Sequence, residues 1–171
     1  ENTIAAFRLA IEEGANMIET DLQYTDDGQF VAYHDMMHLK KKNDIKNIDF
    51  NSWDKLKNLD AGSWFHSKFK GEKIPLLREI LEFASGKAYL NLELKTDVKP
   101  LQAQQIEKMI NIIYYYNFEE HLMFSSFDYQ LLKLVKSIDS TIHTAAIKLP
   151  EQKILPKQPQ QPARKTNRKA C

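Results

Sequence analysis

Strand patterns and helix patterns alternate along the chain from residue 88 to residue 147, and this alternation restricts the fold more than any other feature. Residues 88–95, 121–125 and 141–147 have the apolar content of strands, whereas residues 100–116 and 129–136 have apolar positions at helical spacing. This order is typical of parallel sheets whose strands are joined by helical crossovers, in an open sheet or a closed barrel. The sequence therefore predicts an α/β fold.

The first half of the chain extends the same order toward the N-terminus. Asn2 or Thr3 can cap a helix whose apolar residues have helical spacing, and Gly14 stands where such a helix ends. The other elements predicted before residue 88 are two strands and a helix, at residues 16–22, 29–34 and 76–84.

Acidic residues recur on one face of two predicted strands. Because side chains alternate between the faces of a strand, Glu19 and Asp21 point to the same side, and Glu93 and Lys95 share a side in the same way. His34 ends another predicted strand. If the ends of these strands are neighbours, three carboxylates, an imidazole and an ammonium group come together. Oxygen ligands suit Mg²⁺ or Ca²⁺, and a metal with His and Lys is what phosphoryl chemistry needs.

Each of these motifs has a simpler interpretation when it is taken alone. A Glu-x-Asp sequence at a strand edge is usually a solvated face, and a single histidine such as His34 is often a hydrogen-bonded core residue. The feature that favours a functional site is the order of Glu-x-Asp, His-Asp and Glu-x-Lys, each of which follows core-forming residues at the end of a predicted strand.

Composition limits the class of protein. A chain of 171 residues that is 43% hydrophobic and 27% charged is long enough for one domain with a core, and no apolar run reaches the roughly eighteen residues that a membrane helix needs. Cys171 is the single cysteine, which excludes an internal disulfide and fits a reducing compartment. The net charge of +1 combines +5 in residues 150–171 with −4 in residues 1–149, so the body shows no basic nucleic-acid surface.

Two segments lack a regular pattern. Residues 36–74 are irregular and contain the aromatic residues Trp53, Trp64, Phe65 and Phe69. The lysine run at 40–42 is more typical of a solvated surface than of a phosphate site. Residues 150–171 are rich in Pro, Gln and basic residues, and we expect this tail to be disordered. The predicted domain therefore covers residues 1–149.

A set of short motifs resembles the glycerophosphodiester phosphodiesterase family, especially its bacterial-type cytosolic members. The motifs are, in chain order, Glu1-Asn2-Thr3, Glu19-Thr20-Asp21, His34-Asp35, Asp60-Ala61-Gly62-Ser63-Trp64, Ile74-Pro75-Leu76-Leu77, Asn91-Leu92-Glu93-Leu94-Lys95 and Ser125-Ser126-Phe127. The resemblance runs from Glu1 to about Ile147 and implies a TIM barrel and a cytoplasmic protein. The family's opening His-Arg-Gly triplet and its last strands are absent, so we expect a partial sequence with an incomplete barrel.

The resemblance also implies the roles of the acidic and basic residues. Glu19, Asp21 and Glu93 would bind a divalent cation, Mg²⁺ or Ca²⁺. His34 would be one of two catalytic histidines, and Lys95 would contact the phosphate. This placement agrees with the position of TIM-barrel active sites at the carboxyl ends of the strands.

Other residues are expected to support the site or to bind the substrate. Residues 36–74 look like the family's insertion, a small lobe over the mouth of the barrel. Glu1 and Asp35 would support the site, and Phe127 is a candidate for the wall of the substrate pocket. Trp64 either lines the substrate lobe or packs the lobe on itself.

The implied activity is metal-dependent hydrolysis of glycerophosphodiesters to sn-glycerol 3-phosphate and an alcohol, in lipid and glycerol metabolism. By resemblance, the glycerol 2-hydroxyl attacks the phosphorus and gives a cyclic phosphate, which water then opens. A lysophospholipase D-type activity is the nearest variant. A catalytically inactive fragment or pseudoenzyme is the alternative from another class, because the first catalytic histidine is not within residues 1–171.

Overall fold

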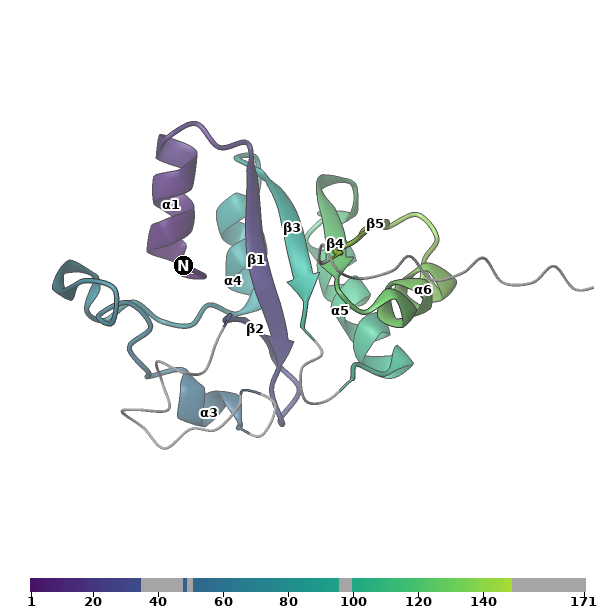
Figure 1. Ribbon diagram of the computed structural model, residues 1–171, viewed down its shortest axis with the longest axis horizontal. Coiled ribbons are helices and arrows are strands. Elements are labelled where there is room, and N and C mark those ends of the chain that lie inside the picture. Colours follow the sequence, from purple (N-terminus) through teal and green to yellow (C-terminus); the bar gives the residue numbers. More distant parts are fainter. Residues whose placement is uncertain (35–47, 49–50, 96–99, 149–171) are drawn as a thin grey trace, which may run out of the picture.

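The computed structural model describes residues 1–34, 48, 51–95 and 100–148. Their strands form a five-stranded sheet in the order β2-β1-β3-β4-β5 (Figure 1). The strands are β1 (Met17–Tyr24), β2 (Phe30–Ala32), β3 (Tyr89–Leu94), β4 (Leu122–Ser126) and β5 (His143–Ala146). β2 pairs antiparallel with β1, and the other neighbours pair in parallel.

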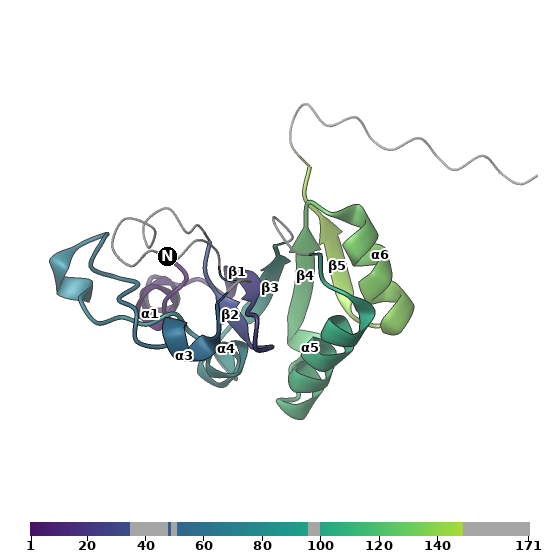
Figure 2. The ribbon, with the colours of Figure 1, turned by 90° about the horizontal axis from the view of Figure 1, so that it is seen from below.

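Helices cover one face of the sheet (Figure 2). They are α1 (Ile4–Glu12), α4 (Leu77–Ala84), α5 (Ala103–Tyr115) and α6 (Tyr129–Ile138). From β3 onward the order is β3, α5, β4, α6 and β5, because the chain must cross back through a helix before it can add a parallel strand. The predicted α/β alternation is therefore confirmed.

The apolar core lies between the sheet and these helices. Ile18 and Leu22 of β1, Leu92 of β3 and Phe124 of β4 are buried there together with Ile106 of α5. Since strand side chains alternate, this burial of every second residue directs the intervening residues of β1 and β3 to the opposite face.

One of the two residues predicted to cap helix α1 does so. Thr3 is the cap, and its Oγ1 accepts a hydrogen bond from the Ala6 N–H at 3.2 Å. Asn2 is not the cap and has a different role, described below. After the helix, Gly14 adopts φ +95°, a left-handed conformation that glycine takes without steric cost.

Two predicted strands are shorter than expected. The strand predicted at residues 29–34 ends at Ala32, so His34 lies beyond it. The strand predicted at residues 141–147 is confined to β5. Both lie at edges of the described sheet, where fewer hydrogen bonds fix the ends of a strand.

Residues 51–74 project from the β2 side of the sheet and are hereafter called the lobe (Figure 1). They contain α3 (Trp53–Leu56) and a 3₁₀ turn at Ser67–Phe69. The lobe has an apolar core separate from that of the sheet, made of Val31, Tyr33, Ile48, Leu56, Ala61, Ile74 and Leu76. The other residues of the predicted insertion, 36–47 and 49–50, and the predicted tail at 150–171 lie outside the described residues.

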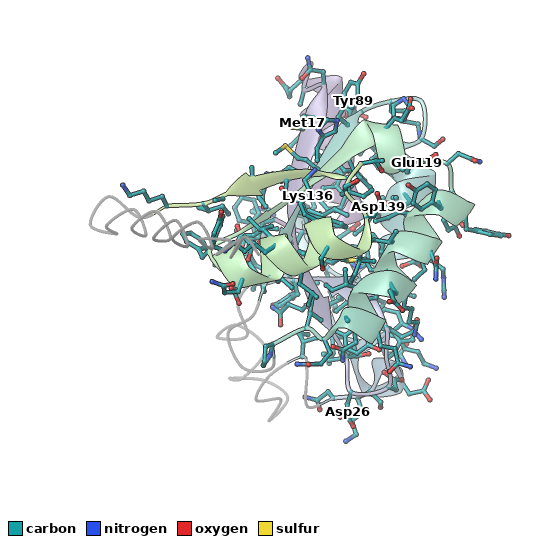
Figure 3. The ribbon with its side chains drawn as sticks, turned by 90° about the vertical axis from the view of Figure 1, so that its right-hand side faces the viewer. Met17, Asp26, Tyr89, Glu119, Lys136 and Asp139 are labelled. Carbon is teal, nitrogen blue, oxygen red and sulfur yellow. The ribbon has the colours of Figure 1, made fainter. Side chains whose placement is uncertain are left out.

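The second face of the sheet is open in the described part of the chain. Met17 and Tyr89 are register partners on this face and are 45% and 50% exposed. Figure 3 shows them together at the amino end of the sheet, with Asp26, which follows β1, at the opposite end. Among the described helices, none is long and apolar enough to cross a membrane.

Candidate active site

Three carboxylates meet on the open face near the carboxyl ends of β1 and β3. Glu19 and Asp21 come from β1, and Glu93 of β3 lies directly opposite Asp21 in the parallel register. One oxygen from each carboxylate lies within 4.8 Å of the others. Asp21 is 5% exposed and Glu93 is 9% exposed, whereas Glu19 is exposed. Carboxylate oxygens at this spacing can hold a divalent cation.

Lys95 places a positive charge beside this cluster. Its Nζ lies 2.9 Å from Asp21 Oδ1 and 2.7 Å from Glu93 Oε1, and its backbone N–H donates to the carbonyl oxygen of Leu22. Loss of hydration lowers the pKa of Lys95, but the hydrogen bonds and charges of Glu93 and Asp21 outweigh this effect and hold the pKa above its ordinary value. Lys95 therefore stays protonated and offsets part of the negative charge of the cluster.

Glu19 is the carboxylate whose ionisation is most disturbed. Partial loss of hydration within the cluster, followed by the charges of Asp21 and Glu93, raises the pKa of Glu19 to about 7. Lys95 and His34 act in the opposite direction with smaller effects. Three like charges this close disfavour full ionisation, and a bound cation would relieve their repulsion.

This raised pKa predicts how stability depends on pH in the absence of a cation. The pKa of Glu19 is about 7 in the folded chain and 4.5 when the group is unperturbed, so folding takes up a proton between these values. The contribution of Glu19 to the free energy of unfolding is fully present below about pH 4.5 and is lost as the pH rises through about 7. In EDTA, the melting temperature should fall more between about pH 5 and pH 8 in the unmodified chain than in Glu19→Gln.

Exposed Glu12 on α1 offers the matched control, because Glu12→Gln removes a carboxylate that belongs neither to the cluster nor to the lining of the cleft. This variant should keep the full pH dependence. Identical melting profiles for the unmodified chain and Glu19→Gln would contradict the assignment.

Asn2 holds Asp21 in place, a role that the sequence analysis missed. Its Nδ2 donates to Asp21 Oδ2 at 2.8 Å, and its Oδ1 accepts from the Asp21 N–H and the Thr20 hydroxyl. Asn2 is 7% exposed and adopts φ 52°, a left-handed conformation that asparagine tolerates better than most residues. The sequence feature that could have pointed to this role is the position of Asn2 in the Glu1-Asn2-Thr3 motif, which was interpreted only as part of the resemblance and as a helix cap.

His34 lies at the edge of the same site. It is exposed, and its carbonyl oxygen accepts a hydrogen bond from Gln23 Nε2 at 3.2 Å. It lines a cleft of about 410 Å³ whose other walls include Glu1 and the three carboxylates. The structure thus brings the predicted histidine and the predicted metal ligands to one cleft. Asp35 lies outside the described residues.

Lys95 does not line this cleft, although it contacts two of the carboxylates that do, and neither do two other predicted site residues. Phe127 follows the carboxyl end of β4 and is 45% exposed. Trp64 lies in the lobe, where its indole N–H donates to the carbonyl oxygen of Ala61 at 2.8 Å. In the described structure Trp64 therefore has a packing contact within the lobe, and a substrate contact for either residue stays a prediction.

Two buried polar atoms beside the carboxylates lack a hydrogen-bond partner within the described part of the chain. They are Asn91 Oδ1, whose residue lies opposite Glu19, and Ser125 Oγ, whose residue lies opposite Glu93. Ser125 is only 2% exposed. Since buried polar atoms in proteins are nearly always paired, these atoms indicate that the face takes up a polar group. The residues present therefore fit a hydrated cation or a phosphate.

The comparison with known families agrees with this arrangement. The model of the glycerophosphoryl diester phosphodiesterase family matches residues 1–164. The chain belongs to this family. The match extends beyond about Ile147, where the resemblance noted in the sequence ends.

Relatives in this family include enzymes and solved structures. The glycerophosphodiester phosphodiesterase of Caldanaerobacter subterraneus is 41% identical over 81% of this chain and 57% of its own length. A crystal structure of the glycerophosphodiester phosphodiesterase from Agrobacterium tumefaciens has a TM-score of 0.74 at 28% identity, and covers 84% of this chain and 59% of its own.

A third relative was solved with a product bound. It is an Oleispira antarctica phosphodiesterase in complex with sn-glycerol-3-phosphate, with a TM-score of 0.72 at 32% identity over 85% of this chain and 60% of its own. The chain thus spans about three fifths of the length of these relatives. The likeness confirms the predicted fold: the described sheet and its helices are part of a TIM barrel in this phosphodiesterase family.

Proposed function

We propose that the protein containing this chain hydrolyses glycerophosphodiesters to sn-glycerol 3-phosphate and an alcohol, as a cytoplasmic enzyme of lipid and glycerol metabolism. The observation that carries the proposal is the convergence of Glu19, Asp21, Glu93, Lys95 and His34 around the carboxyl end of β3. Active sites of TIM barrels lie at this end. The product bound in the Oleispira relative supports the substrate class.

The acidic residues have a specific task in this proposal. Glu19, Asp21 and Glu93 would hold a Mg²⁺ or Ca²⁺ ion, since both ions prefer oxygen ligands. When bound, such a cation supplies Lewis-acid polarisation of a phosphate oxygen and neutralises its charge. Asn2 would keep the Asp21 carboxylate oriented for this purpose through its hydrogen bonds.

Lys95 and His34 would act on the substrate directly. The ammonium of Lys95 is held between two carboxylates and would offset the negative charge that develops on the phosphate. His34 is exposed to the cleft, where its imidazole can accept a proton from the glycerol 2-hydroxyl or return one to the leaving alcohol. Glu1 and Asp35 would support the site, and Phe127 would form part of the substrate wall.

Product analysis tests the proposed reaction. Incubated with glycerophosphocholine and Mg²⁺ or Ca²⁺, the protein should release sn-glycerol 3-phosphate and choline, detectable by ³¹P NMR and a coupled glycerol 3-phosphate assay. Glycerol with phosphocholine as products would mean that the other ester bond is cleaved and would refute the proposal. The same assay on residues 1–171 alone tests the alternative of an inactive fragment, which predicts that only a longer protein has activity.

A further inference from the structure

Aromatic side chains are exposed at the outer end of the lobe. Residues 64–70, hereafter the lobe tip, include Trp64, Phe65 and Phe69, whose rings form a row with centroids 5.9 Å apart at each contact. Phe65 is 67% exposed and Trp64 is 39% exposed. In Figures 1 and 2 this segment lies at the edge of the molecule, on the opposite side from α6. Exposed apolar clusters of this kind commonly mark an interaction surface.

The backbone beneath the lobe tip is held firmly. Asp60 accepts hydrogen bonds from the backbone N–H groups of Gly62 and Ser63 through Oδ1 and of Gly71 through Oδ2. The Ala61 N–H donates to the carbonyl oxygen of Glu72 at 2.8 Å, which closes the loop at its base. The aromatic rings are therefore displayed outward by an ordered loop.

Gly62 shows how tightly this loop closes. A Cβ atom at this position would lie 2.2 Å from the carbonyl oxygen of Phe69, a distance that the backbone does not allow. The close approach brings Gly62 and Phe69 together, so the residues between them form a tight loop.

The charge around the rings is positive. Residues 62–73 contain Lys68, Lys70 and Lys73, and Glu72 is their one acidic residue. The Glu72 carboxylate accepts a hydrogen bond from the Ala5 N–H at the start of α1, so it faces the body of the protein. Lys68 Nζ lies 4.7 Å from the centroid of the Phe69 ring, which places a cation directly beside the aromatic row.

We propose that the lobe tip docks the protein onto a lipid surface that contains anionic headgroups. Aromatic rings favour the boundary between headgroups and acyl chains, and lysines beside them are attracted to anionic lipid. Docking would bring the cleft to phosphodiesters that carry an acyl chain and reside in such a surface. The binding goes beyond the proposed reaction, and its test needs neither substrate nor metal.

Flotation with vesicles measures this binding in residues 1–171. Protein bound to vesicles rises through a sucrose gradient, whereas aggregated protein sinks, so the two are separated. The bound fraction should be high with vesicles containing about 30% phosphatidylglycerol and low with pure phosphatidylcholine, and it should fall as salt screens the lysines. The proposal would be overturned if the protein did not float with the anionic vesicles, or if it floated equally with both kinds of vesicle.

Two variants and two matched controls locate the contact. Phe65→Ser should lower the partition coefficient about tenfold, and Lys70→Glu about fivefold. Neither side chain is buried, so neither change endangers the fold. Tyr115→Ser on α5, at 81% exposure, and Lys133→Glu on α6 make the same chemical changes elsewhere and should leave binding unchanged. Equal losses in the controls would mean that another surface binds.

Tryptophan fluorescence gives an independent readout. The chain contains two tryptophans, Trp53 and Trp64, so Trp53→Phe leaves Trp64 as the single reporter. Anionic vesicles should shift its emission to shorter wavelength and protect it from acrylamide, because the exposed indole moves into an apolar environment. An unchanged spectrum in the presence of bound vesicles would show that the lobe tip stays in water and would refute the proposal.

Discussion

Replacing Glu93 with Gln should remove most of the hydrolysis of glycerophosphocholine at low cation concentration, and raised Mg²⁺ or Ca²⁺ should restore part of it. Glu93 supplies one of the three carboxylates whose oxygens lie within 4.8 Å of one another. The amide of Gln keeps the shape of the side chain but loses its charge, so the cation loses a ligand that attracts it. Changes in groups that merely support metal ligands weaken metal binding about 10- to 100-fold, and we expect at least this loss.

Removal of the cation by a chelator should lower hydrolysis more than Glu93→Gln does, because it empties the site that Glu93→Gln only weakens. EDTA should abolish hydrolysis by the unmodified protein, and Mg²⁺ or Ca²⁺ should restore it, because the negative charge of the carboxylates exceeds the single positive charge of Lys95 and repels an approaching phosphate. Initial rates as a function of free cation concentration give the apparent cation affinity. Glu12→Gln on the exposed face of α1 is the control and should leave this affinity unchanged. Turnover that persists in EDTA would refute the proposed metal dependence.

The sequence predicted the side of the sheet on which the carboxylates lie because the period of a strand is two residues. Once Ile18 and Leu22 are assigned to the core, Glu19 and Asp21 must face the other way. What the period does not determine is the register between strands. The pairing of Asp21 with Glu93 depends on how β1 and β3 slide past each other, which is set by packing against helices distant in sequence.

The role of Asn2 could not be derived from local patterns. Sequence rules treat Asn2 and Thr3 as equivalent helix caps, but the two residues have different roles in the structure. Thr3 caps α1, whereas the side chain of Asn2 donates a hydrogen bond to Asp21. The contact spans a sequence separation of 19 residues and exists only because α1 packs beside β1. Likewise, the family resemblance implied a phosphate contact for Lys95, which stays a prediction, and the structure adds its ion pairs with Asp21 and Glu93.

The lobe shows why irregular segments are the least predictable part of such a chain. The sequence did not decide whether Trp64 contacts the substrate or packs within the lobe. Trp64 lies outside any helix or strand pattern, so no periodicity shows which way its side chain points. Its position follows from the turn that Asp60 stabilises through three backbone N–H groups. Such Asp-stabilised turns are common, but which aromatic residue each one exposes depends on the whole loop.

Replacing His34 with Ala should lower kcat by about 10²- to 10⁴-fold, the usual contribution of a general acid or base. His34 lines the cleft with the carboxylates and is exposed, so its imidazole can reach the substrate without a change in the core. Gln23 Nε2 holds the backbone carbonyl groups of Tyr33 and His34, and this contact does not require the imidazole. The variant should therefore fold normally and bind the cation normally.

The response of His34→Ala to added cations distinguishes its loss of activity from that of Glu93→Gln. Added Mg²⁺ or Ca²⁺ should not restore the activity of His34→Ala, because the missing group transfers a proton and does not bind metal. His121 precedes β4 at the amino end of the sheet, and it serves as the matched histidine. His121→Ala should keep the kcat of the unmodified protein. An unchanged kcat in His34→Ala would assign His34 a structural role, whereas rescue by excess cation would make it a metal ligand.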